Sequence, residues 1–239
     1  MAEARGALPP ARGAATWLRP AAQIWQGGTA LIGALSLLLQ LLLVLFADGA
    51  PLPVRLVRLC SFFTIQSNVL VTVTAAMLAL QPARGGPAFR VIRLDALLCI
   101  AVTGVVHFFL LRPIQHLQGW DAVADYGLHV VVPALAVAGW VLFGPRPRVS
   151  LSTVAWSVVY PLLWIAYTLI HGTIGGWYPY PFVDVSALGY GRVLLNALGV
   201  AVVFLALGGV VLLLDRRLWA APQREPDAED PHTTSSEEA

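Results

Sequence analysis

The chain has 239 residues, of which 58% are hydrophobic and 12% charged, and its formal net charge at pH 7 is +2. A soluble domain is about 25% charged, so this composition excludes an ordinary soluble protein and predicts an integral membrane protein that contacts the lipid bilayer. The sequence contains neither a glycine-rich phosphate loop nor a nucleic-acid-binding motif, so we expect no nucleotide and no nucleic acid as partners.

Six segments are apolar and long enough to cross the bilayer, since a helix needs about 20 residues to span the hydrocarbon. Each segment is bounded by charged residues, proline or glycine, and the connections leave no room for a separate soluble domain. We therefore predict an all-α bundle of six transmembrane helices within residues 23–217. In chain order the segments are Ile24–Ala47, Leu56–Leu80, Val91–Leu111, Ala124–Phe143, Leu151–Ile170 and Arg192–Leu214.

The two ends of the chain differ from this apolar middle. Residues 1–22 are small, basic and broken by proline, and residues 218–239 are acidic and polar, so we expect two disordered tails. All 15 basic residues are arginines, and 11 of them fall in the two tails and the connections on the same side as the tails. The positive-inside rule then places both termini of this multi-pass cell-membrane protein in the cytoplasm.

The second segment carries an unusual polar stretch, SFFTIQSN, at Ser61–Asn68. Its polar residues Ser61, Thr64 and Asn68, followed by Thr72, recur at spacings that place them on one face of a helix. Polar groups at membrane depth are costly unless they face the bundle interior or a cavity, so this face predicts a functional site. The structural alternative is that the hydroxyls return to carbonyls one turn back and that Asn68 bonds to a neighbouring helix.

Ionisable side chains gather at the same depth on the third and fourth segments. His107 lies near the end of the third segment, and Asp125 and His129 lie near the start of the fourth. With the orientation given above, all three fall in the outer half of the bundle, and the inner half has no comparable set. The alternative for His129 is packing, because the missing N–H of Pro133 leaves a carbonyl unsatisfied within that helix.

An aromatic stripe runs along the fifth segment and into the loop that follows it. Trp164, Tyr167 and His171 share a helical face, and Trp177 lies in the loop. We expect these side chains, together with His107, to line a substrate pocket open to the outer leaflet. The alternative is that His171 and Trp177 form an interfacial aromatic belt.

Three stretches of the sequence resemble a known family. FFTIQSN in the second segment, YGLHVVVP at the head of the fourth, and YPLLWIAYTLIHGTIGGWYPYPF through the fifth are similar to the androgen-induced-gene family of six-helix membrane proteins. The similarity is greatest to its bacterial branch, which implies a bacterial plasma membrane. Animal members include hydrolases of fatty-acid esters of hydroxy fatty acids. The resemblance implies a threonine hydrolase of lipid esters without a cofactor, with Thr64 as nucleophile and the His129 of Gly127-Leu-His as its partner.

The residue types at these positions agree with that chemistry. A threonine hydroxyl is a poor nucleophile until a base takes its proton, and histidine suits this role near neutral pH. Asp125, one helical turn before His129, is the candidate that orients the imidazole. We expect Asn68 or Ser67 to bind the substrate by donating a hydrogen bond to the oxyanion of a tetrahedral intermediate.

Three other functions use the same residues differently. A zinc-dependent lipid hydrolase would bind the ion through His107, His129 and His171 with an aspartate. A b-type haem protein would place the haem between facing histidines. A transporter or receptor would bind a lipid or small molecule reversibly, although the lack of paired charges in the inner half disfavours transport.

Overall fold

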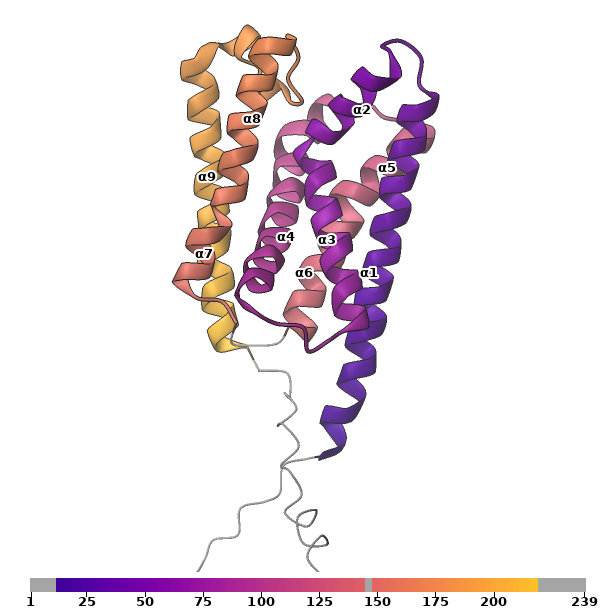
Figure 1. The fold of residues 1–239 in the computed structure, drawn as a ribbon, viewed down its shortest axis with the longest axis vertical. Helices are drawn as coiled ribbons and strands as arrows, with labels where there is room; N and C mark the ends of the chain where they lie inside the picture. Colours follow the sequence, from indigo (N-terminus) through magenta and orange to yellow (C-terminus); the bar gives the residue numbers. More distant parts are fainter. Residues whose placement is uncertain (1–11, 145–147, 219–239) are drawn as a thin grey trace, which may run out of the picture.

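The computed structural model describes residues 12–144 and 148–218, and the backbone of these residues is helical without any strand. Six helices are long and apolar enough to cross a membrane, which confirms the predicted all-α multi-pass architecture (Figure 1). The candidate spans are Pro20–Phe46, Phe63–Leu80, Pro87–Ile114, Gly119–Phe143, Leu151–Gly175 and Val185–Arg217.

The first helix, α1 (Arg12–Phe46), begins earlier than expected. Residues 12–22, which the sequence predicts as part of a disordered tail, are helical instead and extend the apolar span that follows them. Residues 1–11 and 219–239, the remainder of the two expected tails, lie outside the described residues.

Several spans are interrupted where the sequence pattern predicts continuous helices. The second span is divided into α2 (Leu52–Ser61) and α3 (Phe63–Leu80). The last span begins at Val185, seven residues before the predicted start at Arg192. Short π-helical segments interrupt the third and fourth spans. The remaining elements are α4 (Pro87–Val106), η1 (His107–Leu111), η2 (Arg112–Ile114), α5 (Gly119–Tyr126), η3 (Gly127–Val131), α6 (Val132–Phe143), α7 (Leu151–Ser157), α8 (Val159–Gly175), η4 (Pro181–Val183) and α9 (Val185–Arg217).

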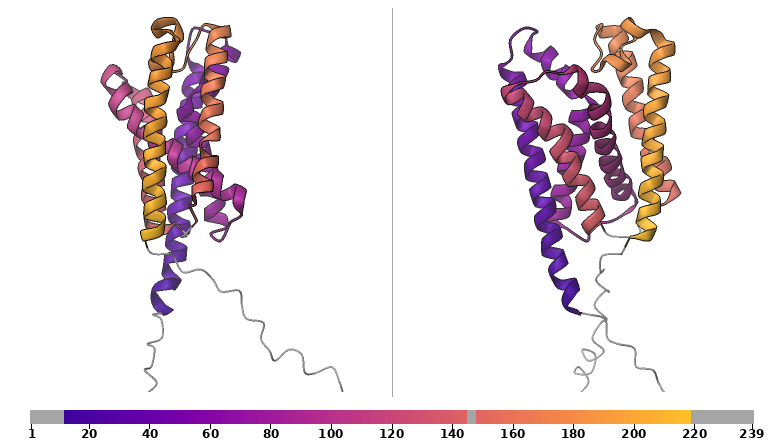
Figure 2. Two further views of the ribbon diagram at one scale, coloured as in Figure 1. Left: turned by 90° about the vertical axis from the view of Figure 1, so that its left-hand side faces the viewer. Right: turned by 180° about the vertical axis from the view of Figure 1, so that it is seen from behind.

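The helix α4 stands at the centre of the bundle. Its residues Leu98, Cys99 and Ile100 have 0% exposure, and it contacts α3 and α6 on one side and α7 and α9 on the other (Figure 2). Helix α1 packs along α3 and α6 at the edge farthest from α9. The start of α1 and the end of α9 lie at one end of the bundle, which we call the terminal end; the end of α8 lies at the opposite end (Figure 1).

Candidate active site

A helix break places Thr64 at the start of a helix instead of in the middle of one. Phe62 has an extended backbone (φ −68°, ψ 127°), so α2 ends at Ser61 and Thr64 lies in the first turn of α3. The backbone groups released by the break find partners: the Gln66 side-chain amide donates to the Cys60 carbonyl (2.8 Å), and the Trp164 indole donates to the Ser61 carbonyl (3.1 Å). N–H groups in a first turn have no intrahelical acceptor and point out of the helix end.

The two histidines of the site both belong to π-helical segments. His107 is the first residue of η1, and His129 is the central residue of η3. Gly104 of α4 packs against η3 and the start of α6, where a Cβ would lie 3.4 Å from the Pro133 Cβ and 3.5 Å from the His129 carbonyl oxygen. This close packing stacks the two imidazoles, with ring centroids 4.1 Å apart and an angle of 14° between the planes. Such π-helical turns are frequent at functional sites.

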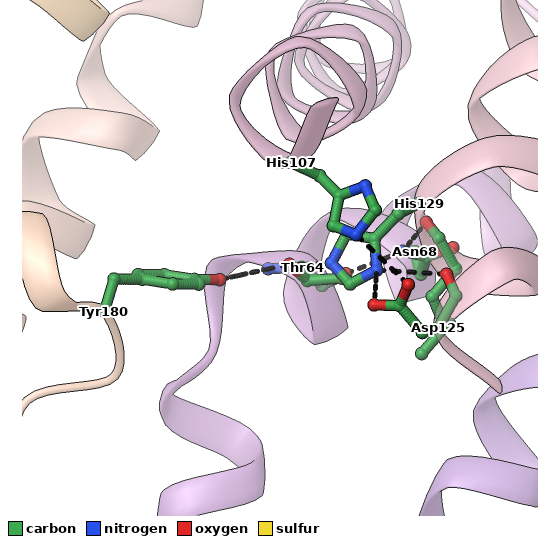
Figure 3. A network of polar contacts seen from close by, with 7 residues as sticks. Thr64, Asn68, His107, Asp125, His129 and Tyr180 are labelled. Carbon is green, nitrogen blue, oxygen red and sulfur yellow. Dashed lines mark hydrogen bonds and ion pairs between the residues drawn. The ribbon is translucent and has the colours of Figure 1, made fainter. Parts of the chain in front are cut away.

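The structure brings Thr64, His129 and Asp125 into one hydrogen-bonded chain (Figure 3). Thr64 Oγ1 lies 3.1 Å from His129 Nε2, and His129 Nδ1 lies 2.8 Å from Asp125 Oδ1 and 3.0 Å from the Asp125 carbonyl oxygen. A main-chain carbonyl only accepts hydrogen bonds, so Nδ1 carries the proton of a neutral imidazole and Nε2 is the acceptor. The Thr64 hydroxyl therefore donates to His129, which is the direction that base-assisted attack requires.

Tyr180 contacts Thr64 from the loop after α8, a contact that sequence reasoning missed. Its hydroxyl accepts from the Thr64 N–H (3.1 Å) and lies 3.1 Å from Thr64 Oγ1, to which it donates because the Thr64 proton points to His129. Edge-to-face packing on Phe62 and stacking on Phe182 fix the ring, at centroid distances of 5.5 and 5.2 Å. Burial raises the pKa of Tyr180 above its usual value, so the phenol remains a donor at neutral pH.

Asn68 and Ser67 are fully buried, but their donors are already used within the protein. The Asn68 amide donates to the carbonyls of Thr64 (2.8 Å) and Leu128 (3.1 Å), which accounts for both of its hydrogens and ties α3 to η3. The Ser67 hydroxyl lies 2.8 Å from the Phe63 carbonyl and also contacts Thr103. In this structure neither side chain offers a donor to a substrate. The contacts of Asn68 are those expected of a side chain that bonds to a neighbouring helix.

The aromatic stripe of α8 faces the junction between α2 and α3. The Tyr167 hydroxyl lies 2.8 Å from Ser61 Oγ, and the ring of Tyr167 stacks on His171 at 5.4 Å. Trp177 lies edge-on to both His171 and Phe62, at 6.2 and 5.6 Å. These residues contact Ser61 and Phe62, at the junction that precedes Thr64 in the chain. The ligand set proposed for zinc is corrected here: among the described residues, His107 and His129 cluster with Asp125, whereas His171 packs against aromatic rings.

We compared the chain with known proteins. No family model, curated protein or solved structure matches it. At the site, a hydroxyl, an imidazole and a carboxylate share hydrogen bonds at a helix N-terminus. Such an arrangement can activate a nucleophile and stabilise a negative charge that develops beside it.

Two buried carboxyl groups lie in the terminal half of the bundle, for which the sequence predicts no set of polar residues comparable with that around Thr64. Asp95 and Asp215 have exposures of 8% and 2%. Asp215 Oδ2 accepts the N–H groups of Arg148 (2.7 Å) and Val149 (2.8 Å), so it fixes the connection before α7. Asp95 begins a buried stripe at four-residue spacing along α4 that ends at His107. This spacing was readable from the sequence as Asp95, Cys99, Thr103 and His107.

Proposed function

We propose that the protein is an intramembrane threonine hydrolase of lipid esters. The observation that carries the proposal is the chain from Thr64 Oγ1 to His129 Nε2 (3.1 Å) and from His129 Nδ1 to Asp125 Oδ1 (2.8 Å). Thr64 Oγ1 attacks the ester carbonyl carbon while its proton passes to His129, which then protonates the leaving alkoxide. Water activated by the same histidine releases the fatty acid from the acyl-threonine, and Asp125 stabilises the imidazolium formed in each step.

Two donors next to Thr64 replace the expected Asn68 and Ser67 as stabilisers of the oxyanion. The Thr64 N–H belongs to the first turn of α3, where the helix dipole favours negative charge, and the Tyr180 hydroxyl bonds both to this N–H and to Thr64 Oγ1. An ester oxygen that enters this position replaces the Tyr180 oxygen as the acceptor of the Thr64 N–H. It accepts a second hydrogen bond from the hydroxyl of Tyr180.

The apolar surroundings of the site favour a lipid substrate. Phe62 and Phe63 flank Thr64 on the α8 side, packed among Trp164 and Tyr180. Phe108 and Phe109 follow His107 and are 56% and 69% exposed on the surface of η1. An amphiphilic ester enters laterally between these aromatic side chains. With the arginine-rich terminal end in the cytoplasm, as the positive-inside rule implies, it comes from the outer leaflet of the cell membrane.

A second candidate is transport, which the buried stripe of α4 favours. Asp95, Thr103 and His107 are 8%, 5% and 3% exposed, and they connect the terminal half of the bundle with the site. Ionisable side chains inside a membrane bundle often mark ion or proton pathways. Proton flux into proteoliposomes under a pH gradient, abolished by Asp95→Asn, would support transport; flux no greater than that of empty liposomes would exclude it.

Labelling with a fluorophosphonate probe tests the hydrolase. We expect the purified protein in detergent to be labelled, and labelling to disappear in Thr64→Ala and His129→Ala. Thr72→Ala is the matched control, because Thr72 lies on the same helix α3 and its hydroxyl has no hydrogen-bond partner among the described residues. Labelling of folded Thr64→Ala at the wild-type rate, or no labelling of folded wild-type protein, would contradict the proposal.

A further inference from the structure

Three ionisable side chains converge from three segments next to Thr64. His107 Nε2 of η1 lies 3.1 Å from Asp125 Oδ2, and His129 Nδ1 of η3 lies 2.8 Å from Asp125 Oδ1 (Figure 3). One ligand-type atom from each of the three side chains lies within 4.8 Å of the other two. The Asp125 carboxylate thus bridges one nitrogen of each of the two stacked imidazoles.

The hydrolase proposed above gives no role to His107. Its side chain is 4% exposed, and its Nε2 has no hydrogen-bond partner among the described residues, although Asp125 Oδ2 is only 3.1 Å away. The nitrogen thus faces the carboxylate at ion-pair distance, although the angle is poor for a hydrogen bond. A buried imidazole nitrogen that is poorly aligned with its neighbour gains free energy when another group, such as a metal ion, binds it.

The spacing of the three groups is close to that of a metal centre. Zinc binds imidazole nitrogen and carboxylate oxygen at about 2.0–2.2 Å in tetrahedral geometry, which places neighbouring ligand atoms about 3.3 Å apart. The observed nitrogen–oxygen separations are 2.8 and 3.1 Å, each to a different oxygen of Asp125, and the three ligand atoms lie within 4.8 Å of one another, so small side-chain shifts bring them to this geometry. Two histidines and one carboxylate are also the ligand set of several catalytic zinc sites, where a fourth position remains open.

We propose that His107 Nε2, Asp125 and His129 Nδ1 bind one divalent transition-metal ion, with zinc as the preferred ion by ligand type. This site also regulates the proposed hydrolase. A neutral imidazole that binds metal through Nδ1 has its proton on Nε2, so His129 then donates to Thr64 instead of accepting from it. Metal-loaded protein therefore cannot remove the Thr64 proton, and zinc switches the nucleophile off. The regulatory step rests on the proposed function, whereas the metal site does not.

A metal titration tests the site without any activity measurement. Chelator-treated protein in detergent is titrated with Co²⁺, whose visible absorption reports tetrahedral binding, and Zn²⁺ is then added to displace it. We expect one ion per chain and at least a 100-fold loss of affinity in His107→Gln, because loss of even an outer-shell partner costs about 10–100-fold. His171→Gln is the matched control, another histidine with a nitrogen that is buried and unpaired among the described residues. Absence of stoichiometric binding, or equal affinity in His107→Gln, would overturn the site.

Probe labelling of the same preparations tests the regulatory step separately. We expect saturating Zn²⁺ to slow fluorophosphonate labelling of the wild type at least tenfold, a chelator to restore it, and His107→Gln to lose this sensitivity to zinc. If metal-free wild type is not labelled, the hydrolase is wrong and the Co²⁺ titration still decides the metal site. If zinc binds but labelling is unchanged, the inhibitory role is wrong and the site stands.

Discussion

Replacement of Asp125 by asparagine separates the charge of the carboxylate from its geometry. Asparagine has nearly the same shape, and its side-chain oxygen can still accept from His129 Nδ1, while its NH2 group turns toward His107 Nε2, 3.1 Å from the present Oδ2. The Asp125 main-chain carbonyl, 3.0 Å from His129 Nδ1, is unchanged by the substitution. The productive tautomer of His129 therefore survives, and only the negative charge is lost.

The expected loss of rate follows from the charge alone. A charged hydrogen bond contributes about 1.5–3 kcal/mol against about 1 kcal/mol for a neutral one, so the difference is at most about 2 kcal/mol. Two unit charges about 4 Å apart attract by about 4 kcal/mol at an effective dielectric constant of about 20, which is an upper bound. The first value limits the decrease to about 30-fold, and the second limits it to about 1,000-fold. The Asp125 side chain is 20% exposed, so screening by water favours the smaller value.

The assay is the second-order rate constant of fluorophosphonate labelling, measured in metal-free detergent buffer on variants whose thermal unfolding has been recorded. Asp121→Asn is the matched control, because Asp121 is exposed and lies one turn before Asp125 on the same helix α5. We expect its labelling rate to remain within a factor of two of the wild type, since surface substitutions are usually within about 0.5 kcal/mol.

Two outcomes would refute this reasoning. An unchanged labelling rate in Asp125→Asn would show that the carboxylate does not stabilise the imidazolium of His129. A loss of about 10,000-fold, the cost of a wrong tautomer in a serine-protease triad, would show that the Asp125 main-chain carbonyl does not fix the proton on Nδ1.

Two further predictions concern stability. Tyr180→Phe leaves the buried Thr64 N–H without its acceptor and should lower the free energy of unfolding by about 1–3 kcal/mol in denaturant titrations. The control Tyr190→Phe changes an exposed tyrosine and should leave this free energy nearly unchanged. Equal effects of the two substitutions would show that the hydrogen bond from Thr64 to Tyr180 does not stabilise the protein. Asp184 caps α9, and its hydrogen bond from Ser186 is the chief reason that its pKa lies below the usual 3.8. Because the folded-state pKa is depressed, this stabilisation is complete above about pH 4 and is lost as the pH falls through the lower folded-state value. The difference in Tm between wild type and Asp184→Ala should therefore narrow below pH 4, and a constant difference would contradict the prediction.

The number of membrane spans could be predicted from the amino-acid sequence alone. Apolar length is a local property, so six spans follow from windows of about 20 residues without any knowledge of their packing. Helical periodicity is also local, and it placed Ser61, Thr64 and Asn68 on one face of the second span. The spacing of Asp125 and His129, one helical turn apart, likewise indicated their contact, because side chains four residues apart on a helix are neighbours.

The hydrogen-bond partners of these side chains could not be predicted in the same way. The helix break at Phe62 contains neither proline nor glycine, so the local sequence does not predict it. It persists because Trp164 on α8 binds the released Ser61 carbonyl, and because Gln66 folds back to Cys60. Sequence reasoning counted Asn68 as a free donor and missed Tyr180, since both depend on groups that lie 60 and 116 residues away along the chain. Hydropathy and periodicity describe which face of a helix is buried, whereas hydrogen-bond partners depend on how the helices pack, and here that packing assembles the site.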